Sequence, residues 1–237
     1  MDGISENIRK IIEAGIRAPS GENAQPWRFV VRDDVIELWN VPERDQFHYN
    51  YKQLASYIAH GAAFENMRVA APVYGYRASK TMFPKPVEPN YVARIDFQKT
   101  NPQKDTLYQA VLKRATNRKP YEARPLGEEA RAIFSNLRVE NSGVELFFTE
   151  EAASIKKLAE VGGTNERVML ENRAFHDYFF AHLNWTRKED DRKRYGFYIK
   201  TLELPPPAQV MFRIIKRWPV CKTFNKLGFA KMAAGQA

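Results

Sequence analysis

The polar segment from residue 17 to residue 27 reads Arg-Ala-Pro-Ser-Gly-Glu-Asn-Ala-Gln-Pro-Trp and joins a helical pattern to a strand pattern. Its serine, asparagine and glutamine offer both hydrogen-bond donors and acceptors. Gly21 permits a backbone conformation with positive φ, and the two prolines restrict the path of the chain. Such a turn can present hydrogen bonds to a flat heterocycle. A capped turn whose Trp27 only fills the core explains the same residues equally well.

A second polar segment, from residue 113 to residue 121, reads Lys-Arg-Ala-Thr-Asn-Arg-Lys-Pro-Tyr. The guanidinium groups of Arg114 and Arg118 match the oxygens of a phosphate, and the Thr116 hydroxyl adds a further hydrogen bond. A solvated basic cluster is the alternative for such a segment taken alone. The residues alone leave both interpretations of this segment open.

The stretch from His60 to Ala71 is rich in small residues and predicts a helix that packs closely against another backbone. We expect no catalytic role for His60, because no histidine is paired with a nucleophile. The single cysteine, Cys221, cannot form an internal disulfide, and no Cys/His pair has the spacing of a zinc site. The sequence therefore predicts no metal and no catalytic triad.

The first half of the chain, residues 1–104, combines helical and strand patterns. Isoleucines at helical spacing predict an opening helix with Ser5 as its N-cap and Pro19 as its stop. Runs of β-branched and aromatic residues predict the strands. The predicted elements are helices over 4–18 and 52–73, and strands over 27–31, 35–39, 74–79 and 91–98.

The second half, residues 105–237, repeats the order of helix followed by strand. The pattern predicts a helix over 128–137, a strand over 144–148 and a long helix over 164–185. Prolines 205–207 end the preceding element of secondary structure, and the C-terminal residues return to helix. This order predicts an internal duplication, although coincidence is the alternative because units of helix and strand are common.

Composition and charge limit the class of protein. The 237 residues are 44% hydrophobic, which is sufficient for a substantial core, and no apolar run approaches the roughly 20 residues of a membrane span. The net charge of +9 is spread among acidic residues, as in 187–194, which predicts a solvated face and no nucleic-acid surface. For the basic C-terminal segment 213–231 we favour a partly buried amphipathic element over an anionic surface contact. With no secretory signal expected at the N-terminus, the predicted location is cytoplasmic.

These segments resemble motifs of the FMN-dependent nitroreductase superfamily. The turn is similar to the element Pro-Ser-x-x-x-x-Gln-Pro-Trp that lies against the flavin, and residues 114–118 are similar to the Arg-x-Ser/Thr-x-Arg/Lys element that holds the FMN phosphate. The stretch 60–71 looks like the small-residue helix beside the flavin. The resemblance implies that FMN is bound by Arg17, Pro19, Ser20, Gly21, Asn23, Gln25, Arg114, Thr116, Asn117 and Arg118.

The layout of the two motifs resembles the internally duplicated, Acg-like branch of that superfamily. The turn occurs only in the first half and the phosphate element only in the second. The resemblance implies an α+β nitroreductase-like fold, a mostly antiparallel sheet covered by helices, with two related halves packed as a pseudo-dimer around one composite FMN site. Relatives continue beyond the equivalent of Ala237, so a C-terminally shortened chain or a reduced site is expected.

The resemblance also implies a function. NADH or NADPH would transfer hydride through the flavin to a nitro compound, a quinone or a similar small-molecule acceptor, and the flavin would carry the chemistry without a catalytic side chain. A flavin-sequestering or redox-sensing protein without turnover is the alternative. A basic C-terminal surface that docks an acidic partner is a third interpretation, and a homo-oligomer stays open.

Overall fold

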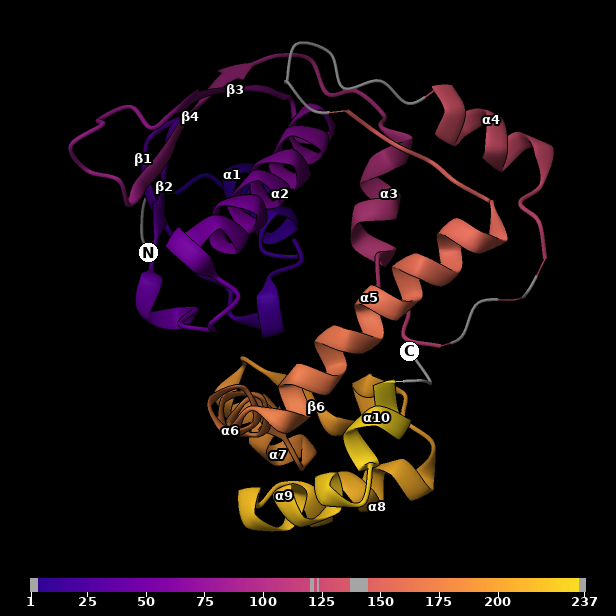
Figure 1. Ribbon diagram of the computed structural model, residues 1–237. Helices are drawn as coiled ribbons and strands as arrows, with labels where there is room; N and C mark the ends of the chain where they lie inside the picture. The colour runs from indigo at the N-terminus through magenta and orange to yellow at the C-terminus, as the bar shows by residue number, and fades with distance from the viewer. Residues whose placement is uncertain (1–3, 120–121, 123, 137–144, 235–237) are drawn as a thin grey trace. The chain divides into compact units, whose positions relative to one another are not determined.

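The computed structural model describes residues 4–119, 122, 124–136 and 145–234 (Figure 1). The chain divides into two compact units. The first unit contains Met1–Asn117 and His182–Leu202, and the second contains Arg118–Ala181 and Glu203–Ala237. This division differs from the predicted boundary at residue 104, and the internal duplication of 1–104 and 105–237 stays a prediction.

The first unit contains a four-stranded antiparallel sheet with the order β1-β2-β4-β3. β1 and β2 form the predicted hairpin, in which Arg32 pairs with Val35 across a tight turn. Alternation along β2 directs Ile36 and Leu38 into the core, as expected of a strand with one buried face. The strands are β1 (Trp27–Arg32), β2 (Val35–Asn40), β3 (Tyr76–Met82) and β4 (Tyr91–Lys99).

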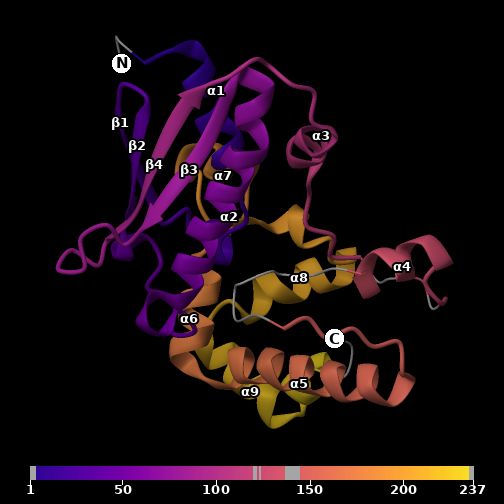
Figure 2. The ribbon, with the colours of Figure 1, turned by 90° about the horizontal axis from the view of Figure 1, so that it is seen from above.

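Two helices, α1 (Glu6–Gly15) and α2 (Leu54–Ala70), pack on this sheet (Figure 2). Ser5 caps α1 as predicted, because its side chain accepts a hydrogen bond from the backbone N–H of Ile8. The helices pack closely at Gly15, where a Cβ atom would lie 2.8 Å from Cγ of Met67. The close packing expected of α2 therefore depends on a glycine in its partner helix.

The connection between α2 and β3 differs from its prediction. Residues Ala71–Tyr74 form a 3-10 turn, and Gly75 follows it with a left-handed φ of 77°. The predicted strand over 74–79 thus begins at Tyr76 and extends to Met82. The short helix α3 (Thr106–Lys113), capped by Asp105, also belongs to the first unit.

A distant segment, His182–Leu202, completes the first unit. It contains the parallel pair β5 (Leu183–Asn184) and β6 (Phe197–Tyr198), connected through helix α7 (Arg187–Lys193). The Asn184 amide holds this segment together by donating to the Tyr195 carbonyl at 2.7 Å and to Asp190 at 3.1 Å. The charge run 187–194 is therefore mostly a helix.

The prediction of one helix over 164–185 is wrong. Helix α5 (Ala152–Glu171) ends at Asn172, helix α6 (Arg173–Ala181) follows, and β5 begins at Leu183. Asn172 has extended backbone angles, and its side-chain oxygen accepts from the backbone N–H of Ala174. An asparagine that caps a new helix start interrupts the helical path, which apolar periodicity alone does not reveal.

Among its described residues, all the regular secondary structure of the second unit is helical. Its remaining helices are α4 (Glu128–Asn136), α8 (Pro206–Ile215), α9 (Trp218–Lys226) and α10 (Phe229–Ala234). The prediction of helix near the C-terminus is thus confirmed. Gly163 in α5 allows close contact with α10, since a Cβ atom there would meet the Ala234 carbonyl.

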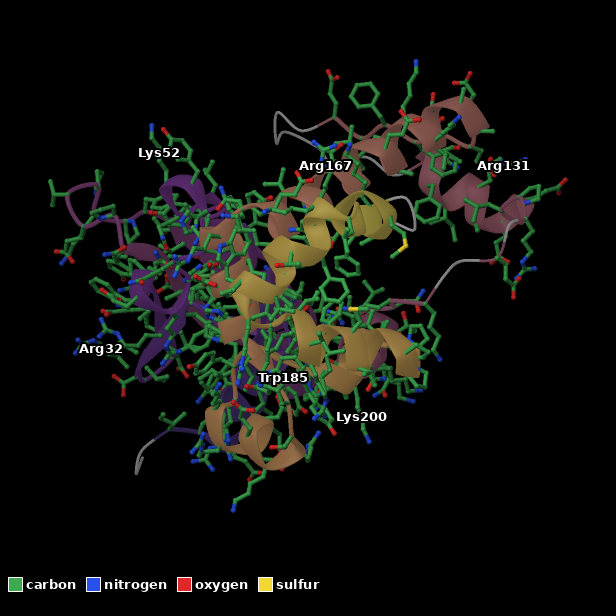
Figure 3. All side chains as sticks on the ribbon, turned by 60° about the horizontal axis from the view of Figure 1, so that its bottom comes forward. Arg32, Lys52, Arg131, Arg167, Trp185 and Lys200 are labelled. Carbon is green, nitrogen blue, oxygen red and sulfur yellow. The ribbon has the colours of Figure 1, made fainter. Side chains whose placement is uncertain are left out.

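The strand predicted over 144–148 is wrong for residues 145–148, which pair with none of the described strands, while residue 144 lies outside the described residues. A β-rich composition forms a strand only where a partner strand is available. Here Arg131 of α4, labelled in Figure 3, instead pairs with Glu150 at 2.6 Å, and the Phe134 and Phe148 rings stack. Side-chain contacts with α4 take the place of a ladder.

Candidate functional site

The turn between α1 and β1 has an unusual backbone. Glu22, Asn23 and Gln25 have φ values of 48°, 56° and 50°, a region that residues with a Cβ rarely adopt. The positive φ expected at Gly21 is absent, because glycines with positive φ among the described residues are Gly75, Gly196 and Gly228. Strain of this kind persists only where surrounding contacts impose it, and it is frequent at ligand sites.

Three hydrogen bonds hold this turn. The Ser20 hydroxyl accepts from the backbone N–H of Gln25 at 3.0 Å. The Gln25 amide donates to the Arg194 carbonyl at 2.6 Å and to the Asn23 carbonyl at 3.3 Å. The side chains of Ser20 and Gln25 thus hold the turn, whereas Asn23 is exposed. Pro19, also exposed, precedes this arrangement.

A cavity of about 530 Å³ lies beside the turn, within the first unit. One wall comes from the turn and the segment after β2, and the other from the end of α7. Arg44 supports the turn, because its Nη1 donates to the carbonyls of Gln25 at 3.1 Å and Trp27 at 3.2 Å. The lining residues are Ala24, Gln25, Glu43, Arg44, His182, Lys193, Arg194 and Tyr195.

A buried carboxyl group lies next to His182. Oε2 of Glu22 is 3.9 Å from Nδ1 of His182, and within the described part of the chain this oxygen accepts no hydrogen bond. Burial, and then the nearby Asp45, raise the pKa of Glu22 to about 8. Burial also raises the pKa of Asp45, although hydrogen bonds from Phe47, Ser56 and Asn50 oppose that shift. Glu22 is therefore mainly protonated at neutral pH.

The structure brings together part of the predicted phosphate element and the start of the turn. Nη1 of Arg17 donates to the Leu112 carbonyl at 3.1 Å. In return, Nη2 of Arg114 donates to the Arg17 carbonyl at 3.2 Å, and its Nη1 lies 3.5 Å from the Thr116 hydroxyl. Arg17, Arg114 and Thr116 are exposed and form one cluster of donors.

The other end of the predicted element belongs to the second unit. Asn117 ends the first unit, and Arg118 begins the second. The backbone N–H of Arg118 donates to the Glu203 carboxylate at 3.2 Å, and the Lys119 ammonium lies 3.5 Å from the same group. The two arginines of the element thus belong to different compact units.

His60 is buried in the core of the first unit. Nδ1 lies 2.5 Å from the Ser56 carbonyl, Nε2 lies 3.3 Å from the Trp39 carbonyl, and the ring meets Trp27 edge-on. Burial lowers its pKa. In the same helix, Asn66 donates to the Ala14 carbonyl at 3.2 Å and so links α2 to α1.

Several residues at this cavity carry no signal in the sequence. Arg44, Lys193, Arg194 and His182 do not stand out there from other charged and polar residues. The alternating charges of 187–194 predict only a solvated face. No local pattern showed that α7 ends at the Ser20–Gln25 turn.

Among the described residues, no cluster of His, Cys, Asp and Glu side chains is suited to a metal ion. Cys221 is buried with its thiol 3.6 Å from the Leu170 carbonyl, and burial raises its pKa. The helices of the described ranges include none with the length and hydropathy of a bilayer span.

Comparison with known proteins relates the first unit to a family. Residues 5–116 match the model of the nitroreductase family. The chain is 29% identical over 121 residues to the "Putative NAD(P)H nitroreductase acg" of Mycobacterium tuberculosis (strain CDC 1551 / Oshkosh), covering 50% of this chain and 37% of that protein. An uncharacterized protein of the same strain is 26% identical over 214 residues, 87% of this chain and 28% of its own length. The chain thus matches only 37% and 28% of the lengths of these two relatives.

A solved structure is also similar to part of the chain. It is described as a putative nitroreductase in complex with FMN from Desulfovibrio desulfuricans, with 23% identity, a TM-score of 0.33, and coverage of 49% of this chain and 90% of that one. The predicted α+β class is confirmed, because helices pack on an antiparallel sheet within the segment that matches the family.

Proposed function

We propose, from the match of residues 5–116 to the model of the nitroreductase family, that this chain binds FMN and transfers hydride from NADH or NADPH to a small nitro, quinone or similar acceptor. The observation that carries the proposal is that the matched segment contains both the Pro19–Trp27 turn and the Arg114 cluster. The relative named acg is described as an NAD(P)H nitroreductase, which supports the same class of donor.

The residues present fit the cofactor. The FMN phosphate requires several N–H or O–H donors, and a guanidinium group has five N–H donors. Arg114 uses one donor of each terminal nitrogen for Arg17 and Thr116, so others are left for a phosphate. At the other end, the exposed Asn23 amide lies in a turn whose backbone is held in one conformation. We infer that Arg17, Arg114, Thr116, Asn117 and Arg118 hold the phosphate and ribityl chain.

The turn has a different role from the arginine cluster. Its side chains are neutral, so Pro19, Ser20, Gly21, Asn23 and Gln25 are placed to contact the edge of the heterocycle instead of the phosphate. When bound, FMN supplies the two-electron chemistry. Hydrogen-bond donors from this chain then favour the added negative charge and orient the ring. We propose one such site per chain, composed of both halves as a pseudo-dimer.

Anaerobic stopped-flow mixing with NADH or NADPH tests the proposal through the flavin absorbance. Loss of the oxidised flavin band within seconds, followed by its return when a quinone or nitro compound is added, is the expected result. Flavin that stays oxidised with both nucleotides contradicts the reductase and supports sequestration. Release of the flavin by denaturation gives the stoichiometry, and a ratio near two per chain contradicts the composite site.

A further inference from the structure

We propose that the cavity beside Gln25 binds an oxyanion group, a carboxylate or a phosphate, of the small molecule that exchanges electrons with the cofactor. The identity of that molecule rests on the function proposed above. The binding of an anion rests on the cavity itself, which lies within the first unit. Its volume of about 530 Å³ is in the range of small-molecule sites.

The charges around the cavity favour an anion. Three cationic side chains and His182 line it, against one carboxylate, that of Glu43. The Lys193 ammonium forms an ion pair with the Glu189 carboxylate, with Nζ and Oε1 2.7 Å apart. Across the ranges that the structure describes, neither Arg44 nor Arg194 forms an ion pair with a carboxylate. At this cavity, two guanidinium groups are therefore not neutralised by a carboxylate of the described residues.

Both arginines are bonded to Gln25 of the turn. Arg44 is oriented by its hydrogen bonds to the carbonyls of Gln25 and Trp27. Arg194 ends α7 in the left-handed region with φ of 56°, and the Gln25 amide binds its carbonyl. An arginine that is already held by hydrogen bonds loses less conformational entropy when it binds a ligand. Its guanidinium group can bind a carboxylate or phosphate through two parallel hydrogen bonds.

The acidic residue behind His182 does not cancel this charge. Burial, with Asp45 as the second cause, raises the pKa of Glu22 to about 8, so Glu22 is mainly neutral at pH 7. A neutral Glu22 3.9 Å from His182 leaves the positive field of Arg44 and Arg194 in place. An ionised carboxylate there would weaken it.

Isothermal titration of the full chain, as purified with its flavin, tests the inference with three probes. The probe 2′,5′-ADP represents the phosphates of a pyridine nucleotide, benzoate represents an acceptor carboxylate, and benzamide is the neutral control. We expect one anionic probe to bind and benzamide not to bind. Binding of 2′,5′-ADP assigns the cavity to the hydride donor, and binding of benzoate alone assigns it to the acceptor.

Variants connect the binding to the cavity. Arg194→Gln and Arg44→Gln should each lower the affinity for the anionic probe roughly tenfold, which corresponds to about 1.4 kcal/mol of binding free energy. Arg192→Gln changes a neighbouring arginine of α7 that does not line the cavity and should leave the affinity unchanged. Because Arg44 also supports the turn, Arg194→Gln is the cleaner variant, and circular dichroism checks that each variant is folded.

Three results would overturn the inference. The first is that neither anionic probe binds, and the second is that Arg192→Gln weakens probe binding as much as Arg194→Gln does. The third is that Arg194→Gln loses FMN, which would assign the cavity to the cofactor phosphate. Failure of the proposed function gives a different result from these three. If the chain binds no FMN, the proposed function is wrong, but titration of the flavin-free chain still shows whether the cavity binds an anion.

Discussion

The side-chain amide of Gln25 donates a 2.6 Å hydrogen bond to the backbone carbonyl of Arg194, a residue 169 positions further along the chain. Both residues have positive φ, 50° for Gln25 and 56° for Arg194. The bond joins the turn that resembles the flavin-contacting element of nitroreductases to the end of α7. The geometry of the turn therefore depends on a segment outside the part of the chain that matches the family, residues 5–116.

Replacing Gln25 tests this connection. Gln25→Ala should lower the free energy of unfolding by about 1 kcal/mol, because the hydrogen bonds from its side chain to the Arg194 and Asn23 carbonyls are lost. Urea denaturation measures the change, with Gln98→Ala at an exposed position of β4 as the control that should stay near wild type. Equal stability of both variants would mean that the Gln25 bond contributes nothing to the fold.

The raised pKa of Glu22 predicts a pH dependence of stability. In the unfolded chain Glu22 ionises near 4.5, whereas in the folded chain its pKa is about 8. Between these values the folded chain keeps a proton that the unfolded chain has released, so the free energy of unfolding falls as pH rises and levels off above about 8.

Glu22→Gln removes this dependence. The difference in stability between the variant and the wild type should grow from near zero below pH 4.5 to a few kcal/mol in favour of the variant at pH 8. Asp45, which is present in both proteins, adds a dependence of the same sign. Urea denaturation at a series of pH values measures the two curves, and parallel curves would show that Glu22 ionises normally in the folded chain.

Gly196 is a position where a side chain is not tolerated. Its φ is 81°, and a Cβ atom there would meet the His182 carbonyl, whose oxygen also accepts from the Phe197 N–H at 2.8 Å. Gly196→Ala should therefore lower the free energy of unfolding by about 2 kcal/mol or more. This value adds the cost of a left-handed backbone at a residue with a Cβ to the cost of the steric contact. Gly228→Ala is the matched control, because φ is 88° there and no atom lies within 4 Å of the added Cβ. If the melting temperature falls no more in Gly196→Ala than in this control, the steric contact adds no cost.

Arg114 and Arg118 are expected to bind the FMN phosphate. Arg114→Ala and Arg118→Ala should each weaken FMN binding by about 1.5 to 3 kcal/mol, the usual contribution of a hydrogen bond to a charged group. Titration of the apoprotein with FMN, followed by flavin fluorescence, measures the affinities, and exposed Arg9→Ala of α1 serves as the control. Wild-type affinity in both arginine variants would place the phosphate elsewhere.

Local patterns were sufficient to predict most elements of the first unit. The hairpin of β1 and β2, the strand β4 and the helix α1 follow from apolar periodicity and capping residues, which act between neighbours in sequence. The α+β class followed from the family motifs and these elements together. The same methods failed at Asn172 and at residues 145–148, where a capping side chain and the lack of a partner strand decide the structure.

The candidate site divides in the same way. The sequence by itself singled out the residues of the Ser20–Gln25 turn and of the 114–118 cluster, because their types are unusual for plain connectors. Only the tertiary structure placed His182–Leu202 with the first unit, paired Gln25 with Arg194 and buried Glu22 beside His182. Periodicity reports which face of an element is buried, but not which distant segment covers it. The pKa of Glu22 and the charge of the cavity depend on that distant segment.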